Sequence, residues 1–260
     1  MKSVAKVNYL GSNGEVVRTG EEGGGWDFLY THTTTKDEWY NIGDRVELPD
    51  GRVFRYGYAD TARTSGYAMR FNASVAQGYT NLAAVAAIGA RSVKVVSAIT
   101  LTEDELRGGY ITLYTGDPNN TFRGILGNTA VTATGTVTIY LDAPLHVAVT
   151  TSTGSEFFYN PYAHLWEAPG EYSSIAGIAV ADMSTAGYCW IQTWGMIRLT
   201  FKPGQNPGQT SMSRQLVFAV DGPLSPHGTD RGAQQHAGFI VDKTSASAGS
   251  YALIMLQISP

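Results

Sequence analysis

The sequence predicts an all-β protein, built as one or more β-sandwich or barrel-like domains with short helical turns and an extended N-terminal arm. Short runs of alternating apolar and polar residues, which are typical of half-buried strands, recur along the chain. The 30 Gly and 10 Pro residues favour frequent turns over long helices. No stretch has the helical period that a long helix would need.

The composition describes a chain with a large core and a surface poor in charge. Its 260 residues can bury a substantial core. Only 15% of them are charged, against about 25% in typical soluble domains. The surface is therefore covered by uncharged polar residues, or much of it is occupied by neighbouring molecules. A net charge of −4 gives no global basic field, so we expect no nucleic-acid partner.

Two further features exclude other classes of protein. Cys189 is the only cysteine, which excludes an intrachain disulfide and a cysteine metal cluster. The N-terminus lacks an apolar core of signal-peptide length, and the apolar stretches within residues 81–99 are too short and interrupted to span a bilayer. We therefore expect a soluble protein with no membrane partner.

The first 40 residues predict an N-terminal arm or irregular lead-in. Three consecutive glycines precede Trp26, and Trp26, Phe28 and Tyr30 alternate as they would in a short strand. Residues 41–260 form the expected β-rich domain, either undivided or divided near residues 90–100.

A β-hairpin over residues 44–59 is the clearest element. Alternating apolar runs flank the sequence Pro-Asp-Gly, in which Pro49 presets φ and Gly51 supplies a positive φ. Residues 59–90 fit either a short helix or a buried loop, because their apolar residues are small and show no period.

The rest of the chain continues the strand pattern. Thr102 and Glu105 have capping-box spacing, which predicts a single helical turn. Gly187 and Gly195 are expected bend or bulge positions. Strands are expected over residues 92–101, 110–114, 135–141, 175–183, 185–201, 215–220 and 251–258, with a polar loop over residues 202–214.

Catalytic constellations are scarce. The sequence contains no G-x-S-x-G, H-E-x-x-H or C-x-x-C motif and no phosphate-binding loop. The acidic run 103–105 is best interpreted as a solvated helix start. His227, Asp230 and His236 are the best metal candidates, although a polar surface loop is the preferred interpretation. We therefore expect no enzyme, no cofactor and no bound metal.

Aromatic residues remain as candidates for function. In YCWIQTW, Tyr188, Trp190, Gln192 and Trp194 share one strand face, and the residues between them share the other. The strand side that carries Tyr188, Trp190 and Trp194 suits a core or a protein interface in preference to sugar stacking, because interfaces are enriched in aromatics and depleted of charge. The candidate core or subunit-interface residues are Trp26, Tyr159, Tyr162, Trp166, Tyr188, Trp190 and Trp194.

Five segments between Ile42 and Gly195 carry a resemblance to known proteins. They are GDRVELPDGRVFRYGYA, LRGGYITLYTG, FRGILGNTAV with GTVTIYLDAPL, FFYNPYAHLW, and AGIAVADMSTAGYCWIQTWG. Their order and spacing resemble a family of tailed-bacteriophage head decoration or capsid-associated structural proteins. None of the segments is a catalytic signature.

This resemblance implies a structural role in a virion that is assembled in the host cytoplasm. The implied protein decorates the outer surface of the head shell, with the major capsid protein and copies of itself, as a homotrimer, for partners. The alternative is a tail or fibre component that binds a host-surface glycan or receptor. A virion glycan depolymerase is a third hypothesis, and this enzyme would need a carboxylate pair near Trp190 and Trp194.

Overall fold

The chain folds into two units, one of which is inserted into the sequence of the other. The computed structural model describes residues 8–10, 26–71, 75–116, 120–167, 174–200, 214–219, 223–226, 235–243 and 251–260. A discontinuous unit comprises Met1–Asn72 and Tyr162–Pro260, and an inserted unit comprises Ala73–Pro161. The expected division near residues 90–100 is wrong, because strand β7 (Ser92–Ser97) lies there and pairs along its length inside the inserted unit.

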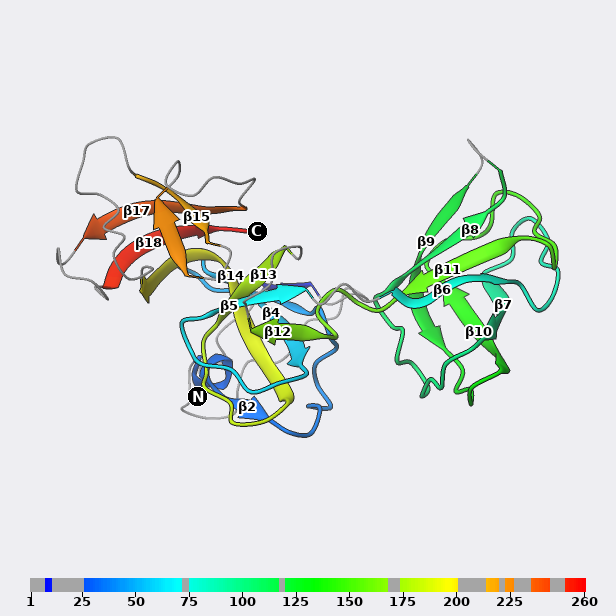
Figure 1. Ribbon diagram of the computed structural model, residues 1–260, viewed down its shortest axis with the longest axis horizontal. Coiled ribbons are helices and arrows are strands. Elements are labelled where there is room, and N and C mark those ends of the chain that lie inside the picture. The colour runs from blue at the N-terminus through cyan, green and yellow to red at the C-terminus, as the bar shows by residue number, and fades with distance from the viewer. Residues whose placement is uncertain are drawn as a thin grey trace, which may run out of the picture. The chain divides into compact units, whose positions relative to one another are not determined.

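The prediction of an all-β fold is confirmed. Within the described residues the only helix is the short 3-10 helix η1 (Asp27–Tyr30), so the strand expected around Trp26, Phe28 and Tyr30 is wrong. The strands follow one another along the chain with turns between them (Figure 1).

Five strands of the discontinuous unit close into a barrel. They are β4 (Val53–Ala59), β12 (Leu165–Glu167), β5 (Ala68–Phe71), β13 (Ile175–Ala179) and β14 (Gly187–Thr200). Every neighbouring pair is antiparallel except β12 and β4, which pair in parallel at Leu165 and Ala59. An odd number of strands cannot alternate in direction around a closed ring, so one parallel pair is required.

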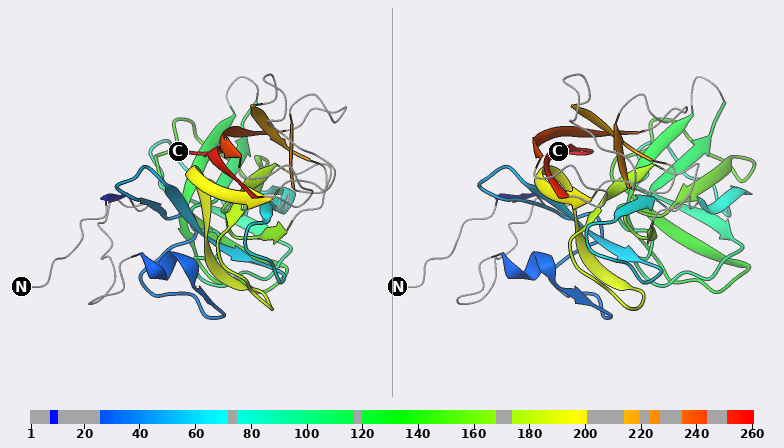
Figure 2. Two further views of the ribbon diagram at one scale, coloured as in Figure 1. Left: turned by 90° about the vertical axis from the view of Figure 1, so that its left-hand side faces the viewer. Right: turned by 60° about the vertical axis from the view of Figure 1, so that its left-hand side comes forward.

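Strand β14 links this barrel to a second, open sheet. Its first half pairs with β4 from Gly187 to Trp194, and its second half pairs with β18 from Trp194 to Thr200. The yellow strand curves along its length as it passes from one sheet to the other (Figures 1 and 2). The open sheet continues from β14 through β18 (Tyr251–Gln257), β17 (His236–Lys243), β15 (Gln215–Phe218) and β16 (Leu224–Pro226).

The predicted hairpin over residues 44–59 is present. Strand β3 (Arg45–Glu47) pairs with β4, and Gly51 adopts a φ of 84° in the turn between them. Strand β1 (Asn8–Leu10) pairs with the outer side of β3.

The described residues between 26 and 40 belong to the discontinuous unit and do not form a separate arm. Leu29 of η1 is fully buried, and β2 (His32–Thr33) pairs with β14. The remainder of the expected arm, residues 1–7 and 11–25, lies outside the described residues.

The inserted unit is a six-stranded antiparallel sheet that curls until its two edges meet (Figure 1). A bridge joins Leu82 to Val95, and the Ala83 N–H donates to the Lys94 carbonyl at 2.7 Å. These contacts protect edges that would otherwise pair with other chains. The strand order is β6 (Val75–Asn81), β11 (Gly154–Phe158), β8 (Tyr110–Tyr114), β9 (Thr121–Asn128), β10 (Gly135–Leu141) and β7.

The insertion begins and ends on paired strands. In the inserted unit Val75 pairs with Phe158, so the first and last strands are neighbours. In the discontinuous unit Phe71 pairs with Leu165, so the strands before and after the insertion are neighbours too. Adjacent ends are the arrangement that allows one domain to be inserted into another.

Candidate functional site

The aromatic side chains at the start of β14 lie in the core of the discontinuous unit. Trp190 is 2% exposed, and its ring centroid lies 5.0 Å from that of Tyr40 and 5.9 Å from that of Phe28, both edge-on. Tyr188 stacks on Tyr56 with 6.0 Å between ring centroids. Trp190 is therefore a core residue of this chain.

Burial changes the acid–base behaviour of this cluster. Removal from water raises the pKa of Tyr40 to about 12, and the nearby Asp37 and Asp44 carboxylates act in the same direction. Burial also raises the pKa of Tyr56 to about 12. Both tyrosines therefore remain protonated, and hence uncharged, far into the alkaline range.

Trp26, another of the predicted aromatic residues, packs at the margin of the cluster, with its ring 6.4 Å from that of Phe28.

Residues on the other side of β14 line a second core cluster, in the five-strand barrel. Cys189 and Ile191 are buried there together with Met183. Burial raises the pKa of the Cys189 thiol, and the nearby Arg63 guanidinium only partly offsets this effect. Arg63 is itself buried, contacts the Met183 sulfur and donates to the Thr61 carbonyl at 3.1 Å. The thiol is thus a neutral core group.

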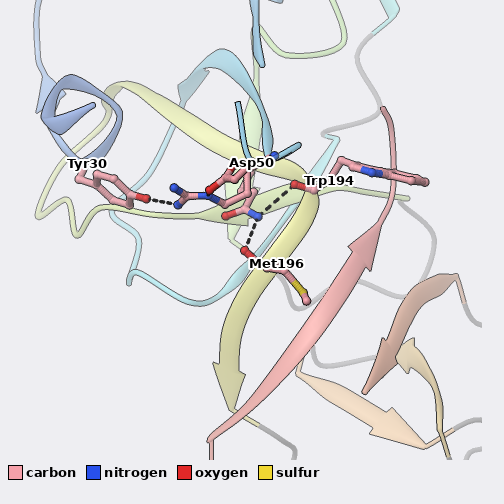
Figure 3. A network of polar contacts seen from close by, with 6 residues as sticks. Tyr30, Asp50, Trp194 and Met196 are labelled. Carbon is pink, nitrogen blue, oxygen red and sulfur yellow. Dashed lines mark hydrogen bonds and ion pairs between the residues drawn. The ribbon is translucent and has the colours of Figure 1, made fainter. Parts of the chain in front are cut away.

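A bulge interrupts β14 after Gln192 and separates Trp194 from the aromatic core. The Gln192 side-chain amide donates to the carbonyls of Trp194 and Met196, both at 3.0 Å. Figure 3 shows these two bonds as dashed lines. Gly195 adopts a φ of 94°, a left-handed conformation that suits glycine. Gly195, expected as a bend or bulge position, lies just after this bulge and pairs in regular register with Leu256, and Trp194 is half-buried.

The hairpin turn packs against this bulge through Arg52. Its guanidinium donates to the Tyr30 hydroxyl at 2.7 Å and pairs with the Asp50 carboxylate at 2.8 Å (Figure 3). A Cβ atom on Gly195 would lie only 2.8 Å from the Arg52 Cα. These contacts fix the turn and the bulge together, which is a structural role.

Trp166 lies in a small polar cluster on β12. Its indole N–H donates to the Asp60 carboxylate at 2.9 Å, and the Arg70 guanidinium lies 5.1 Å from its ring centroid. His164 Nδ1 lies 3.0 Å from the same Asp60 carboxylate. This cluster joins β12 to β4 and β5, and the Trp166 indole N–H already has a hydrogen-bond acceptor in Asp60.

Tyr159 and Tyr162 lie in different units. Tyr162 makes an edge contact with Phe71, with ring centroids 5.5 Å apart, and the Arg55 guanidinium lies 5.9 Å from its ring. Tyr159 packs against the core of the inserted unit. Burial raises the pKa of Tyr159, and the neighbouring Glu105 carboxylate raises it further. The seven predicted aromatics therefore do not converge on one site.

The inserted unit carries exposed aromatic residues that the sequence analysis did not select. Tyr79 on β6 and Phe122 on β9 are 68% and 58% exposed. Between these strands lie Tyr110 and Tyr114 of β8, which are also exposed. We call these four residues the aromatic face. The signal was present in YITLY, because Ile111 and Leu113 take the core positions and leave the tyrosines outside.

An aliphatic loop between β6 and β7 is the second exposed feature. Val85 is 71% exposed and Ile88 is 68% exposed. The loop backbone is nevertheless fixed: Ala86 and Val149 exchange hydrogen bonds of 3.0 and 2.9 Å, and the Gly89 N–H donates to the Leu145 carbonyl at 2.8 Å. We call residues 82–90 the aliphatic loop. Residues 59–90, for which a short helix or a buried loop was considered, instead contain strands β5 and β6 followed by this exposed loop.

The described residues offer no cluster that resembles a metal site. Within the ranges given above, no group of three or more His, Cys, Asp or Glu side chains is placed to hold a metal ion. His227 and Asp230 lie outside the described residues. The third member of the suggested cluster, His236, has its Nε2 atom 3.4 Å from the Gln257 side-chain oxygen.

The acidic run near residue 104 caps a turn. The Thr102 N–H donates to the Glu105 carboxylate at 2.7 Å, which is one of the two contacts of a capping box, and the Thr102 hydroxyl donates to the same carboxylate at 2.8 Å. Asp104 pairs with Arg107 at 3.7 Å. The Asp104 and Glu105 carboxylates therefore bind groups of the same turn.

Comparisons with known proteins do not extend this description. No protein-family profile, curated protein or solved structure matches the chain. In the part of the chain that the structure describes, no helix has the length and apolarity needed to cross a membrane.

Proposed function

We propose that this chain is a structural component of a tailed-phage virion, a decoration protein that binds the outer surface of the head shell. Its partners in this proposal are the major capsid protein and further copies of itself, as a homotrimer. The observation that carries the proposal is the aliphatic loop, together with the resemblance of the five sequence segments to virion proteins.

The aliphatic loop has the properties of a protein-docking element. Val85 and Ile88 expose aliphatic surface that is stabilised only when a partner removes it from water. Neither side chain has a polar group, so the complementary surface must itself be apolar, as a protein groove is. The backbone hydrogen bonds of Ala86 and Gly89 hold the loop in place, so docking orders little additional chain.

The charge distribution supports the same partner. Residues 82–90 contain no charged side chain, and the whole chain has only 15% charged residues. Interfaces that become fully buried are depleted of charge in the same way, because unpaired charges are costly to remove from water.

A binding assay with phage heads tests the proposal. Purified full-length chain is mixed with expanded heads assembled without it, pelleted through a sucrose cushion and imaged by electron cryomicroscopy. We expect wild-type chain to sediment with the heads as density on the shell. The variant Val85→Asp/Ile88→Asp should lose this binding, whereas Val241→Asp, which alters an exposed aliphatic residue of the discontinuous unit, should retain it.

Two results would contradict this assignment. One is full shell occupancy by the folded Val85→Asp/Ile88→Asp variant. The other is density on the tail or fibres in place of the head. That location would favour the second candidate function, a tail component that binds host-surface glycan, which the exposed rings of the aromatic face support.

A further inference from the structure

We propose that the aromatic face of the inserted unit binds a neutral glycan. This inference goes beyond a structural role in the virion and does not depend on where in the virion the chain lies. It rests on the position of four aromatic rings and on the carboxylates beside them.

Tyr79 and Tyr114 form the first part of the platform. A Cβ atom on Gly154 would lie 2.2 Å from the Tyr79 ring, so the tip of this ring crosses the β11 backbone where glycine leaves room. Tyr79 nevertheless remains 68% exposed. The Tyr114 ring lies beside it, with 5.6 Å between centroids and 37° between the ring planes. The pair thus presents ring surface outward from the sheet.

Tyr110 and Phe122 form the second part. Their ring centroids are 5.2 Å apart and their planes differ by only 14°, an offset stack. Both rings are exposed, at 39% and 58%. Tyr110 pairs with Gly124 across the strands, so no side chain from β9 covers it at that position.

Each ring pair has a carboxylate next to it. The Glu156 carboxylate accepts a hydrogen bond from the Tyr114 hydroxyl at 2.8 Å and keeps further acceptor sites. The Asp142 carboxylate lies over Gly124, because a Cβ atom built there would be 2.7 Å from its Oδ2 atom. The platform therefore combines aromatic surface with strong hydrogen-bond acceptors.

This combination fits a sugar ring. One face of a pyranose carries C–H bonds, whose partial positive charge packs on the negative face of an aromatic ring. The hydroxyl groups at its edge donate hydrogen bonds, which carboxylates accept. Two carboxylates in the site repel acidic polysaccharides, so the ligand is a neutral glycan.

The same carboxylates argue against a protein on this face. An apolar protein surface would bury Glu156 and Asp142 without donors, at a large cost in desolvation. A second copy of the chain docked symmetrically through this face would bring like charges together.

Affinity electrophoresis of the full-length chain tests the inference. Native gels contain dextran, laminarin, galactomannan or the anionic polysaccharide alginate as the probe. We expect at least one neutral polysaccharide to retard the wild-type chain and alginate not to do so. Tyr79→Ala and Phe122→Ala should each weaken binding by about tenfold, since each removes a stacking surface.

Matched variants separate binding from folding. Tyr79→Phe keeps the ring and should bind nearly as well as wild type. Tyr67→Ala removes an exposed aromatic residue of the discontinuous unit and should not change binding. Glu156→Gln keeps the shape of the side chain but weakens its acceptor, so it should reduce binding.

Several results would overturn the inference. They are the lack of retardation by all three neutral polysaccharides, equal retardation by alginate, and unchanged binding by folded Tyr79→Ala and Phe122→Ala. Dissociation of an oligomer by these variants in analytical ultracentrifugation would show a subunit interface instead. Binding of Tyr79→Ala to phage heads should stay at the wild-type level, which distinguishes failure of this inference from failure of the proposed function.

Discussion

Trp190 and Trp194 belong to the same strand but have different surroundings. Trp190 is enclosed by Phe28, Tyr40 and Tyr56, whereas Trp194 follows the bulge and is half-buried. The alternation predicted for this strand applies to Tyr188 and Trp190, which belong to one cluster, while Cys189 and Ile191 belong to another. It could not indicate that both sides are buried, because distant segments supply the covering residues.

Replacing these two tryptophans should have unequal effects. Trp190→Ala leaves a cavity in a closed aromatic cluster, so it should lower the free energy of unfolding by about 3–5 kcal/mol. Trp194→Ala should cost less than about 2 kcal/mol, because the side chain is already partly in water. Urea unfolding followed by circular dichroism measures both values. Equal losses would contradict the assignment of Trp190 alone to the core.

The buried tyrosines should make the protein sensitive to alkali. In the folded chain the pKa of Tyr40 and of Tyr56 is raised from 10.0 to about 12. Between these values the folded chain binds more protons than the unfolded chain, so the free energy of unfolding should fall as the pH rises. Below this window the contribution is complete.

Tyrosinate absorbance, titrated with pH in parallel with circular dichroism, measures this effect. The last ionisation should coincide with loss of native structure, and Tyr40→Phe should remove part of that late step. Ionisation of every tyrosine near the ordinary pKa, with the fold intact, would contradict the assignment.

At the scale of the elements, the bulge between Gln192 and Trp194 lies where β14 passes from one sheet to the other. The φ of 94° at Gly195, just after this bulge, and the contact of Gly195 with Arg52 both require the missing side chain. Local sequence could predict a special backbone conformation at Gly195 and a turn at Gly51. It could not predict the pairing of β12 with β4 and β5, because Leu165 is far from Ala59 and Phe71 in the sequence.

Alanine substitutions should separate backbone strain from steric contact. Gly51→Ala places a Cβ in open space at a φ of 84°, so it should cost about 1–2 kcal/mol from strain alone. Gly195→Ala adds a clash with the Arg52 Cα at 2.8 Å and should cost about 2–5 kcal/mol. Urea unfolding of both variants measures the difference. Equal costs would show that the contact with Arg52 is readily relieved.

For the whole molecule, the main feature is one β-sheet unit inserted into the sequence of another. The boundaries at Asn72 and Pro161 could not be predicted, because both units have the same pattern of strands and turns. The aromatic face could not be predicted for a related reason: Tyr79 meets Tyr114, and Tyr110 meets Phe122, only after β6, β11, β8 and β9 have formed one sheet.

The inserted unit should fold when expressed alone. It has its own core, which includes Ile111, Leu113, Ile139 and Phe157, and its edge strands are joined by the Leu82–Val95 bridge. A chain of residues 73–161 should therefore unfold cooperatively on heating and retain the binding of the neutral glycan. Calorimetry and affinity electrophoresis measure these properties. A non-cooperative transition would show that the unit needs the rest of the chain.

The adjacent ends of the insertion also affect the order of folding. Pairing Phe71 with Leu165 through an unfolded segment of about 90 residues would carry a loop-closure cost about 2 kcal/mol greater than through a short connection. Once Val75 has paired with Phe158, the two flanking strands are already held close together. Folding of the inserted unit therefore lowers the entropic cost of pairing β5 with β12. In pulsed hydrogen exchange, the backbone amides of Ile111 and Leu113 should become protected before that of Met69.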